Sequence, residues 1–249
     1  MPHRELKWEI PVYDKKLHRR RALMNKKIAC AKCTKMACAN STTGDQGPSN
    51  CPTRIKRDVI EQALFEYDKP EVREFARQAS IQEFECYMKL PEGITTRNPR
   101  IEEVAQFAKK MGYKKLGIAF CGGLAAEAKT LTTILENRGF DVVSVICKAG
   151  AIDKERIGIT GEQKIAGPGS PESMCSPITQ AEILNSEGTE FNILVGLCVG
   201  HDSLFFKYSH ALCTVLIVKD RVFGHNPVQG LYLSGSYYYK LMRKESLNS

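Results

Sequence analysis

The second half of the chain alternates between short apolar runs and amphipathic stretches. The apolar runs have the length and composition of buried β-strands and lie at residues 116–120, 140–146, 191–197 and 214–218. Helical patterns separate them at residues 124–137, 177–185 and 202–208, and Ser176 and Pro177 suit the start of a helix. Strands that are apolar throughout and alternate with helices predict a mostly parallel sheet of about four strands. The fold class is therefore α/β and Rossmann-like, without the G-x-G-x-x-G fingerprint of dinucleotide binding.

The preceding residues predict a helical segment at 55–112. Helices are expected at 55–67, 70–89 and 99–111, with Gly112 as a C-cap. The first should bury Ile55, Val59, Ala63 and Leu64, and the second Val72, Phe75, Ala79 and Phe84. Residues 1–54 are polar, basic and rich in cysteine. Three regions follow: 1–54, a basic arm and cysteine-rich region; 55–112, helices; and 113–249, the α/β domain.

Cysteine usage changes the picture most. The 249 residues include ten cysteines, and the start of the chain has no apolar secretory segment. The apolar runs are too short for a membrane span, so a cytoplasmic protein is expected. In a reducing compartment, frequent cysteines indicate metal binding or catalysis rather than disulfides.

The net charge of +8 is concentrated near the start of the chain, at Lys15, Lys16, Arg19, Arg20, Arg21, Lys26 and Lys27. A basic arm of this kind is usually a solvated segment, but it can also contact nucleic acid or an acidic protein. Tyr13 is the aromatic residue beside it, so stacking on single strands is poorly supported and nucleic acid is disfavoured as a partner.

Four cysteines lie close together in the first region. Cys30, Cys33, Cys38 and Cys51 follow a C-x2-C-x4-C-x12-C pattern, and Pro52 comes after the last. Four thiolates at such spacing are metal ligands, for zinc or for an iron–sulfur cluster. Scattered structural thiols are the alternative, but this stretch lacks the apolar periodicity of a core.

A second set is dispersed in sequence. Cys121, Cys147 and Cys198 each end a predicted strand, and Cys175 precedes the helix that starts at Pro177. The carboxyl ends of parallel strands share one edge of a sheet, where helix N-termini also lie and ligands bind. We therefore expect these four to converge on a second metal centre. The alternative is that cysteine packs as a small hydrophobe, which suits Cys86 and Cys213 better.

Polar residues gather at the same edge. The candidates for catalysis or metal ligation are His201, Asp202, Lys219 and His225. Glycines permit close approach of a bound group and cations balance a thiolate cluster, so the candidate cofactor-binding residues are Gly122, Gly123, Lys148, Arg221 and Asn226. Loop histidines are also commonly structural.

Several stretches resemble one family. They are GIAFCGGL at 117–124, MCSP at 174–177, FNILVGLCVGHDSLF at 191–205 and KDRVFGHNP at 219–227. They are similar to an uncharacterised family of prokaryotic proteins, many from anaerobes, known as a domain of unknown function and often labelled predicted metal-binding proteins. The resemblance covers about residues 28–235. It implies metal binding through the eight cysteines of the two sets and no particular activity.

Three functions remain open from the sequence. The leading hypothesis is a redox or electron-transfer protein with one or two iron–sulfur clusters, of the [4Fe–4S] type, together with a redox partner protein and a small-molecule ligand at the strand carboxyl ends. The second is a zinc-stabilised binding module whose basic arm contacts nucleic acid or an acidic partner. The third is a cysteine-dependent enzyme in which Cys198 is the nucleophile near His201.

Overall fold

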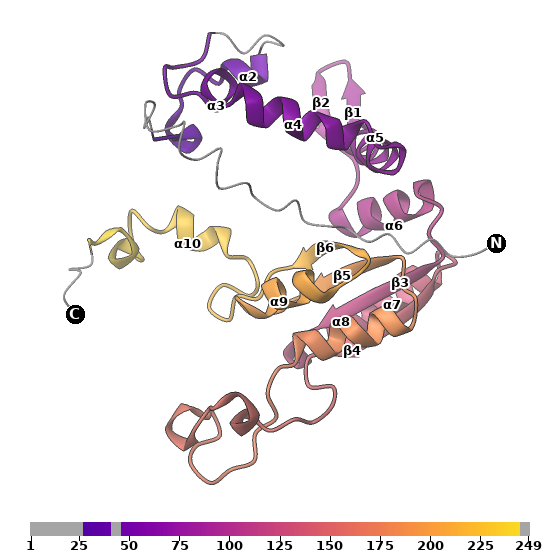
Figure 1. The fold of residues 1–249 in the computed structure, drawn as a ribbon, viewed down its shortest axis with the longest axis vertical. Coiled ribbons are helices and arrows are strands. Elements are labelled where there is room, and N and C mark those ends of the chain that lie inside the picture. Colours follow the sequence, from indigo (N-terminus) through magenta and orange to yellow (C-terminus); the bar gives the residue numbers. More distant parts are fainter. Residues whose placement is uncertain (1–26, 41–45, 245–249) are drawn as a thin grey trace. The chain divides into compact units, whose positions relative to one another are not determined.

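A computed structural model describes residues 27–40 and 46–244, and the basic arm predicted at the start of the chain lies largely outside them. The chain divides into two compact units, residues 1–80 and 81–249, which are considered separately below. Figure 1 labels the elements of both units. No helix in the described residues is long and apolar enough to cross a membrane.

The first unit is made of short helices. It contains η1 (Cys30–Lys32), α2 (Ala37–Asn40), α3 (Pro52–Ile55), α4 (Arg57–Tyr67) and most of α5 (Pro70–Glu85). The helix expected from residue 55 instead starts at Arg57, because Lys56 (φ −126°, ψ 34°) departs from helical geometry. The inward face expected for this helix is wrong: α4 has no buried residue, and Val59 and Leu64 are 41% and 55% exposed.

A β-hairpin follows α5 where the sequence predicted a continued helix. β1 (Tyr87–Leu90) pairs antiparallel with β2 (Gly93–Thr96), and Leu90 lies opposite Gly93. The helix expected to reach residue 89 therefore ends at Glu85, because Pro91 and Gly93 favour a tight turn that pairs the flanking residues. Phe84, expected to point inward, is 70% exposed, whereas its neighbour Gln82 is buried.

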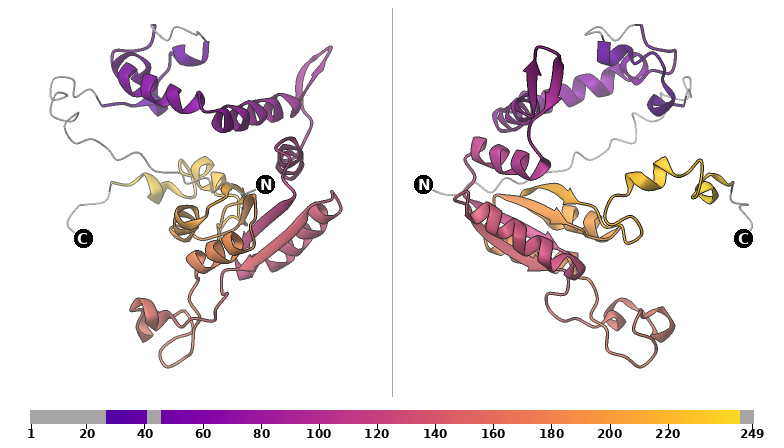
Figure 2. Two further views of the ribbon diagram at one scale, coloured as in Figure 1. Left: turned by 45° about the vertical axis from the view of Figure 1, so that its right-hand side comes forward. Right: turned by 180° about the vertical axis from the view of Figure 1, so that it is seen from behind.

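The second unit contains the predicted parallel sheet. Its strands are β3 (Lys115–Phe120), β4 (Asp141–Ile146), β5 (Phe191–Val195) and β6 (Leu212–Ile217), in the order β4-β3-β5-β6. All three pairings are parallel. α8 (Pro177–Ser186) and α9 (His201–Tyr208) cover one face, and α7 (Ala125–Glu136) covers the other, as the opposite views in Figures 1 and 2 show. The predicted Rossmann-like α/β architecture is confirmed.

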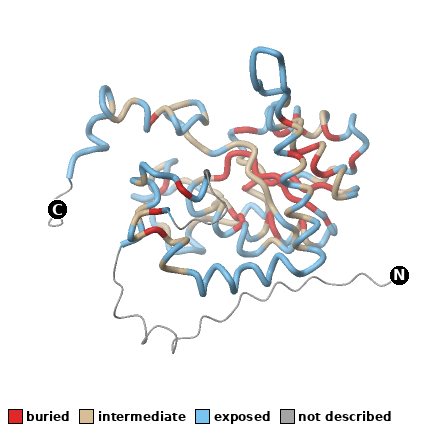
Figure 3. The backbone as a smooth tube through the Cα atoms, turned by 90° about the horizontal axis from the view of Figure 1, so that it is seen from above, coloured by how far each residue is buried: buried red, intermediate tan, exposed pale blue. Residues whose placement is uncertain are grey.

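Apolar strands bury the core of this unit. Leu116, Ile118 and Ile193 are fully buried, and Figure 3 shows buried residues concentrated around the sheet. α6 (Arg100–Lys110) adds Phe107, whose ring centroid lies 5.6 Å from that of Phe191. Such close packing of apolar side chains is the main source of stability for a domain of this kind.

One polar group is built into the core beneath a glycine. Asn192 on β5 is fully buried, accepts a hydrogen bond from Thr189 Oγ1 (2.8 Å) and donates one to Ser209 Oγ (2.9 Å). Gly117 on the adjacent β3 leaves room for it, since a Cβ there would lie 2.0 Å from Asn192 Oδ1. Gly117 is therefore required by space.

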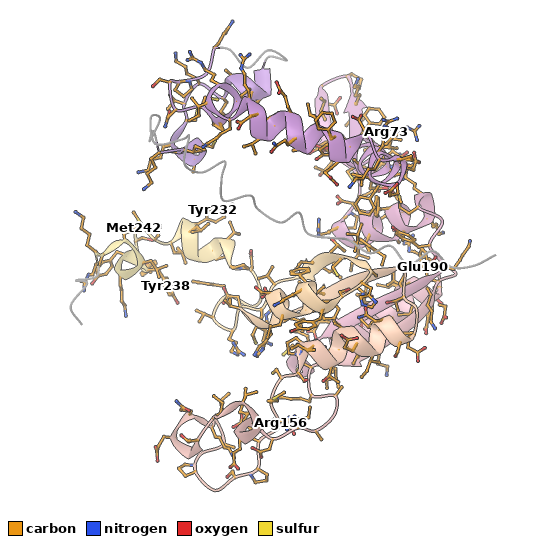
Figure 4. All side chains as sticks on the ribbon, viewed as in Figure 1. Arg73, Arg156, Glu190, Tyr232, Tyr238 and Met242 are labelled. Carbon is orange, nitrogen blue, oxygen red and sulfur yellow. The ribbon has the colours of Figure 1, made fainter. Side chains whose placement is uncertain are left out.

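The strand carboxyl ends face a long excursion of the chain. Residues 147–176 join β4 to α8 and include η3 (Lys154–Ile157) and η4 (Gly161–Gln163). Figure 4 shows Arg156 on this excursion and Glu190 at the opposite end of the sheet. Towards the C-terminus the second unit adds a short α-helix, α10 (Val228–Tyr232), and a 3-10 helix, η5 (Tyr239–Met242). Another 3-10 helix, η2 (Gly122–Leu124), lies between β3 and α7.

Candidate functional site

Four cysteines lie at the carboxyl edge of the sheet, as the strand assignments require. Cys121 and Cys147 come directly after β3 and β4, Cys198 follows β5, and Cys175 precedes Ser176, the N-cap of α8. We call these four residues the rim cysteines. They sit on three connections of one sheet, with Cys147 and Cys175 at the two ends of the same connection, and the fold therefore gathers residues that are up to 77 positions apart in sequence.

Backbone hydrogen bonds fix the rim segments to one another. The N–H of Cys121 donates to Val195 O (3.0 Å), and the N–H of Cys147 donates to Phe120 O (2.8 Å). The N–H of Ser176 donates to Cys147 O (2.7 Å), which brings the start of α8 against the end of β4. The positions of the sulfurs therefore follow from the sheet ladder rather than from free loops.

Cys147 and Cys175 form a close pair. Their sulfurs are 3.8 Å apart, within hydrogen-bonding distance for sulfur, and the N–H of Gly122 donates to Cys147 Sγ (3.4 Å). Cys147 is only 4% exposed, whereas Cys175 is partly exposed. The two thiols therefore meet at the boundary between the core and the solvent.

The different environments of the two thiols shift their pKa values in opposite directions. The pKa of Cys175 is lowered to about 5, chiefly by its hydrogen bond with Cys147 and then by the positive charges of Lys148 and His201, which outweigh the opposing effect of burial. The pKa of Cys147 is raised, first by its hydrogen bond to Cys175 and then by burial. At neutral pH the proton therefore rests on the buried Cys147, and Cys175 carries the thiolate.

A second contact holds Cys198. Arg221 Nη2 donates a hydrogen bond to Cys198 Sγ (3.1 Å). That bond is the main reason the pKa of Arg221 is raised, and negative charge on Cys121 and Cys175 contributes in the same direction. One guanidinium thus hydrogen-bonds to Cys198 and lies within electrostatic range of Cys121 and Cys175.

Lysines occupy the rest of the rim. Lys148 Nζ donates to the backbone oxygen of Ser173. Lys219 Nζ lies where a Cβ on Gly123 would be only 3.1 Å away, and the same Cβ would be 3.9 Å from Cys121 Sγ. Gly123 therefore leaves space for Lys219 beside Cys121. Together with Arg221, these lysines surround the rim cysteines with positive charge, as an anionic thiolate centre requires.

The other predicted site residues have structural contacts. His225 Nδ1 accepts a hydrogen bond from the N–H of Asp220 (3.1 Å), and its backbone has a positive φ of 67°. Asp202 Oδ1 accepts from the N–H of Ser203 (2.8 Å) within α9. Asn226 is exposed and its backbone N–H donates to Phe223 O (3.1 Å). His201 begins α9, and its backbone N–H donates to Cys198 O (2.9 Å).

Sequence reasoning missed Gln180 of α8. This side chain is fully buried, and its Nε2 donates to Val145 O (2.7 Å) and Phe120 O (3.2 Å), next to the rim. Within the described residues its Oε1 has no hydrogen-bond partner. A polar residue in line with the apolar Ala181 and Leu184 was the available signal. Gln180 ties α8 to the ends of β3 and β4 and so helps to fix the rim.

The N-terminal cysteines are arranged differently. Cys30 and Cys38 are exposed, Cys33 is half-buried, and Cys51 is buried as the N-cap of α3. Hydrogen bonds from Thr53, chiefly its side chain, lower the pKa of Cys51. Residues 41–45, between Cys38 and Cys51, lie outside the described part.

The cysteine positions can be compared with the ligand geometry that a bound metal requires. In the described residues, no three or more His, Cys, Asp or Glu side chains are grouped as metal ligands. At the rim, however, a tetrahedral metal with bonds of about 2.3 Å places two sulfurs about 3.8 Å apart. The Cys147–Cys175 distance of 3.8 Å fits two ligands of one such metal. The thiolate chemistry and the surrounding cations also fit.

The fold and the rim define a cysteine-rich α/β protein with a parallel sheet. The chain belongs to the family described as Protein of unknown function (DUF1847), whose model matches residues 51–216. It is 44% identical over 213 residues to an uncharacterized protein of Methanocaldococcus jannaschii, and the match spans 86% of this chain and 97% of that relative. The resemblance to an uncharacterised family is confirmed. The matched range includes all four rim cysteines and Cys51.

Proposed function

We propose that this protein is a redox protein that carries a thiolate-bound metal centre at the rim, with an iron–sulfur cluster as the leading candidate. The observation that supports it is the placement of four cysteines, from three connections, at the carboxyl edge of one sheet. Arg221 interacts with Cys198, Cys121 and Cys175, and Cys175 lies 3.8 Å from Cys147. Scattered packing thiols have no reason to share one guanidinium.

The rim residues would act on the bound group in distinct ways. The four cysteines would hold it, and it would supply reversible one-electron transfer. Lys148, Lys219 and Arg221 offset the negative charge of the thiolates, and the N–H of Gly122 donates to one sulfur. Hydrogen bonds and cations at sulfur stabilise the more negative, reduced state of a centre. Electron transfer also requires a redox partner protein, which we place at the partly exposed edge of the rim.

The N-terminal set would hold a second centre. Cys30, Cys33, Cys38 and Cys51 supply four cysteine sulfurs within 22 residues, and the pKa of Cys51 is lowered by its hydrogen bonds from Thr53. Two centres in one chain would provide two redox sites, and the rim is where a small molecule would bind.

The test is metal analysis on the full chain purified without oxygen. We expect iron and acid-labile sulfide, and an electron paramagnetic resonance signal after reduction. Cys175→Ser should lose the metal of the rim while keeping that of the N-terminal set, and Cys33→Ser should do the reverse. Cys213→Ser, at a cysteine that is half-buried and hydrogen-bonded to Ser209, is the matched control.

A zinc-stabilised binding module is the second candidate, and the spacing of Cys147 and Cys175 favours it specifically. A [4Fe–4S] cluster takes its cysteines on different irons, whereas a single zinc would take both of these sulfurs. A colourless chain with stoichiometric zinc and no sulfide would replace the redox proposal with this one. A chain that binds neither metal above background would refute both.

A further inference from the structure

We propose that Cys175 and Cys147 also form a dithiol that is oxidised to a disulfide by exchange with a small anionic disulfide. This activity uses two rim cysteines but goes beyond the proposed function, because no metal takes part. The motivating geometry is a pair of sulfurs 3.8 Å apart that differ in exposure. Such a pair has an attacking sulfur and a resolving sulfur already in contact.

The backbone around the pair is arranged for closure. The N–H of Ser176 donates to Cys147 O (2.7 Å), so the two chain segments are in direct hydrogen-bonding contact. A second tie, from the N–H of Met174 to Ile152 O (2.7 Å), holds the base of the excursion closed. A disulfide needs a sulfur–sulfur bond of about 2.0 Å between neighbouring chain segments. Rotation of two side chains can therefore supply the remaining approach.

Exposure and charge set the order of events. Cys175 is partly exposed, and Lys148 Nζ donates to the backbone oxygen of Ser173, two residues before it. Cys147 is 4% exposed, so an external disulfide reaches Cys175 first. In the described residues the side-chain partner of Cys198 is Arg221 rather than another sulfur. The structure thus singles out one pair among the rim cysteines.

The exchange balances in two steps. The thiolate of Cys175 attacks one sulfur of the external disulfide, forms a mixed disulfide and releases the first thiolate. The thiol of Cys147 then loses its proton to that released thiolate, and its sulfur attacks Sγ of Cys175 and displaces the second thiolate. The protein loses two electrons and the one thiol proton held by Cys147, and the external disulfide becomes two thiols once the second thiolate has taken up a proton from water.

The charge of the rim indicates the substrate class. Lys148, Lys219 and Arg221 all lie near the rim sulfurs, and Arg221 is exposed. A cationic site attracts anions and can raise their association rate by an order of magnitude or more at low salt. A disulfide that carries carboxylates should therefore react faster than a cationic disulfide of the same size.

The experiment uses the full chain, reduced and freed of metal by a chelator. Dithiodiglycolate and cystamine serve as matched anionic and cationic disulfides, and each rate is divided by the rate with the urea-unfolded chain. We expect a product lighter by two hydrogen atoms, with Cys147 and Cys175 linked in the peptide map. After normalisation, the anionic probe should be faster by about tenfold or more, with the advantage falling as salt is added.

Variants separate the steps. Cys147→Ser and Cys147→Ala should both accumulate a mixed disulfide on Cys175, whereas Cys175→Ser should leave Cys147 almost unmodified. Cys213→Ser should behave as the wild type. The proposal is overturned by linkage of another cysteine pair, by two free thiols after reaction, or by faster reaction with cystamine. Metal analysis is independent of these outcomes, so a chain that binds metal without forming this disulfide refutes only the exchange activity.

Discussion

Gly196 separates two cysteine-bearing segments, and replacing it by alanine should disturb both the fold and the rim. Gly196 has a φ of +70°, and a Cβ there would lie 2.3 Å from Cδ1 of Leu124, which is 1% exposed. Leu124 lies three residues after Cys121, and Gly196 lies two residues before Cys198. Relief of this contact therefore moves one or both rim segments.

The cost follows from two separate terms. An alanine in left-handed backbone geometry is disfavoured by about 1–2 kcal/mol. Forcing a methyl group into a packed contact adds about 1–3 kcal/mol. Gly196→Ala should therefore lower the free energy of unfolding by about 2–5 kcal/mol, which corresponds to a melting temperature lower by roughly 4–20 °C.

A matched glycine isolates the steric term. Gly188 has a similar φ of +67° but no atom within 4 Å of its hypothetical Cβ. Gly188→Ala should therefore cost only the backbone term, about 1–2 kcal/mol. Combining Gly196→Ala with Leu124→Ala removes the clash, so the double variant should be more stable than the sum of the two losses by about 1 kcal/mol or more.

The assay is urea unfolding of the full chain followed by far-ultraviolet circular dichroism, with each variant compared at the same chain concentration. Metal content and the linkage of the rim cysteines are measured on the same samples at a temperature where Gly196→Ala remains folded. Equal losses for Gly196→Ala and Gly188→Ala, or strict additivity with Leu124→Ala, would refute the steric argument.

Three further results are expected. The rate of alkylation of Cys175 in the metal-free chain should stay high as the pH falls from 9 and should drop through about pH 5, since the pKa of Cys175 is lowered to about 5. Lys148→Met should raise that pKa, and rates measured across pH should then drop at a higher pH. Gly117→Ala should break the two hydrogen bonds of Asn192 and lower the free energy of unfolding, measured in urea, by about 2–5 kcal/mol. The chain with a Cys147–Cys175 disulfide should resist urea better than the reduced chain by about 3–4 kcal/mol, because the bond closes a loop of roughly 30 residues; an oxidised chain of equal or lower stability would contradict this.

The sheet was predictable because its strands are buried on both faces. An apolar run such as 116–120 can hardly form anything else between two helical patterns, and β3 (Lys115–Phe120) matches it to within one residue. The convergence of cysteines at one edge then follows from parallel topology alone. Contacts that depend on the path of a loop, such as that of Arg221 with Cys198, could not be predicted from the sequence, because several loop paths satisfy the same strand order.

The hairpin at residues 87–96 shows where periodicity misleads. The apolar residues that follow Phe84 continue a helical spacing, and the local pattern alone could not show that Tyr87 and Thr96 would pair. The turn chemistry of Pro91 and Gly93 was the competing signal. In α4 the apolar spacing predicted a helix correctly but not its burial, because the spacing of a sequence says nothing about what is available to cover a face.

The excursion between β4 and α8 has a consequence for protein engineering. The N–H of Lys154 donates to Glu172 O (3.0 Å), and the Lys154–Glu172 and Lys164–Glu155 ion pairs lie within the excursion. The stretch between Lys154 and Glu172 is thus a self-contained module on a hydrogen-bonded neck. The hydrogen bonds that join this excursion to the end of β4, from Met174 to Ile152 and from Ser176 to Cys147, lie outside that stretch. We therefore expect that the module can be shortened, replaced by a reporter or fused to an affinity tag while the rim stays assembled.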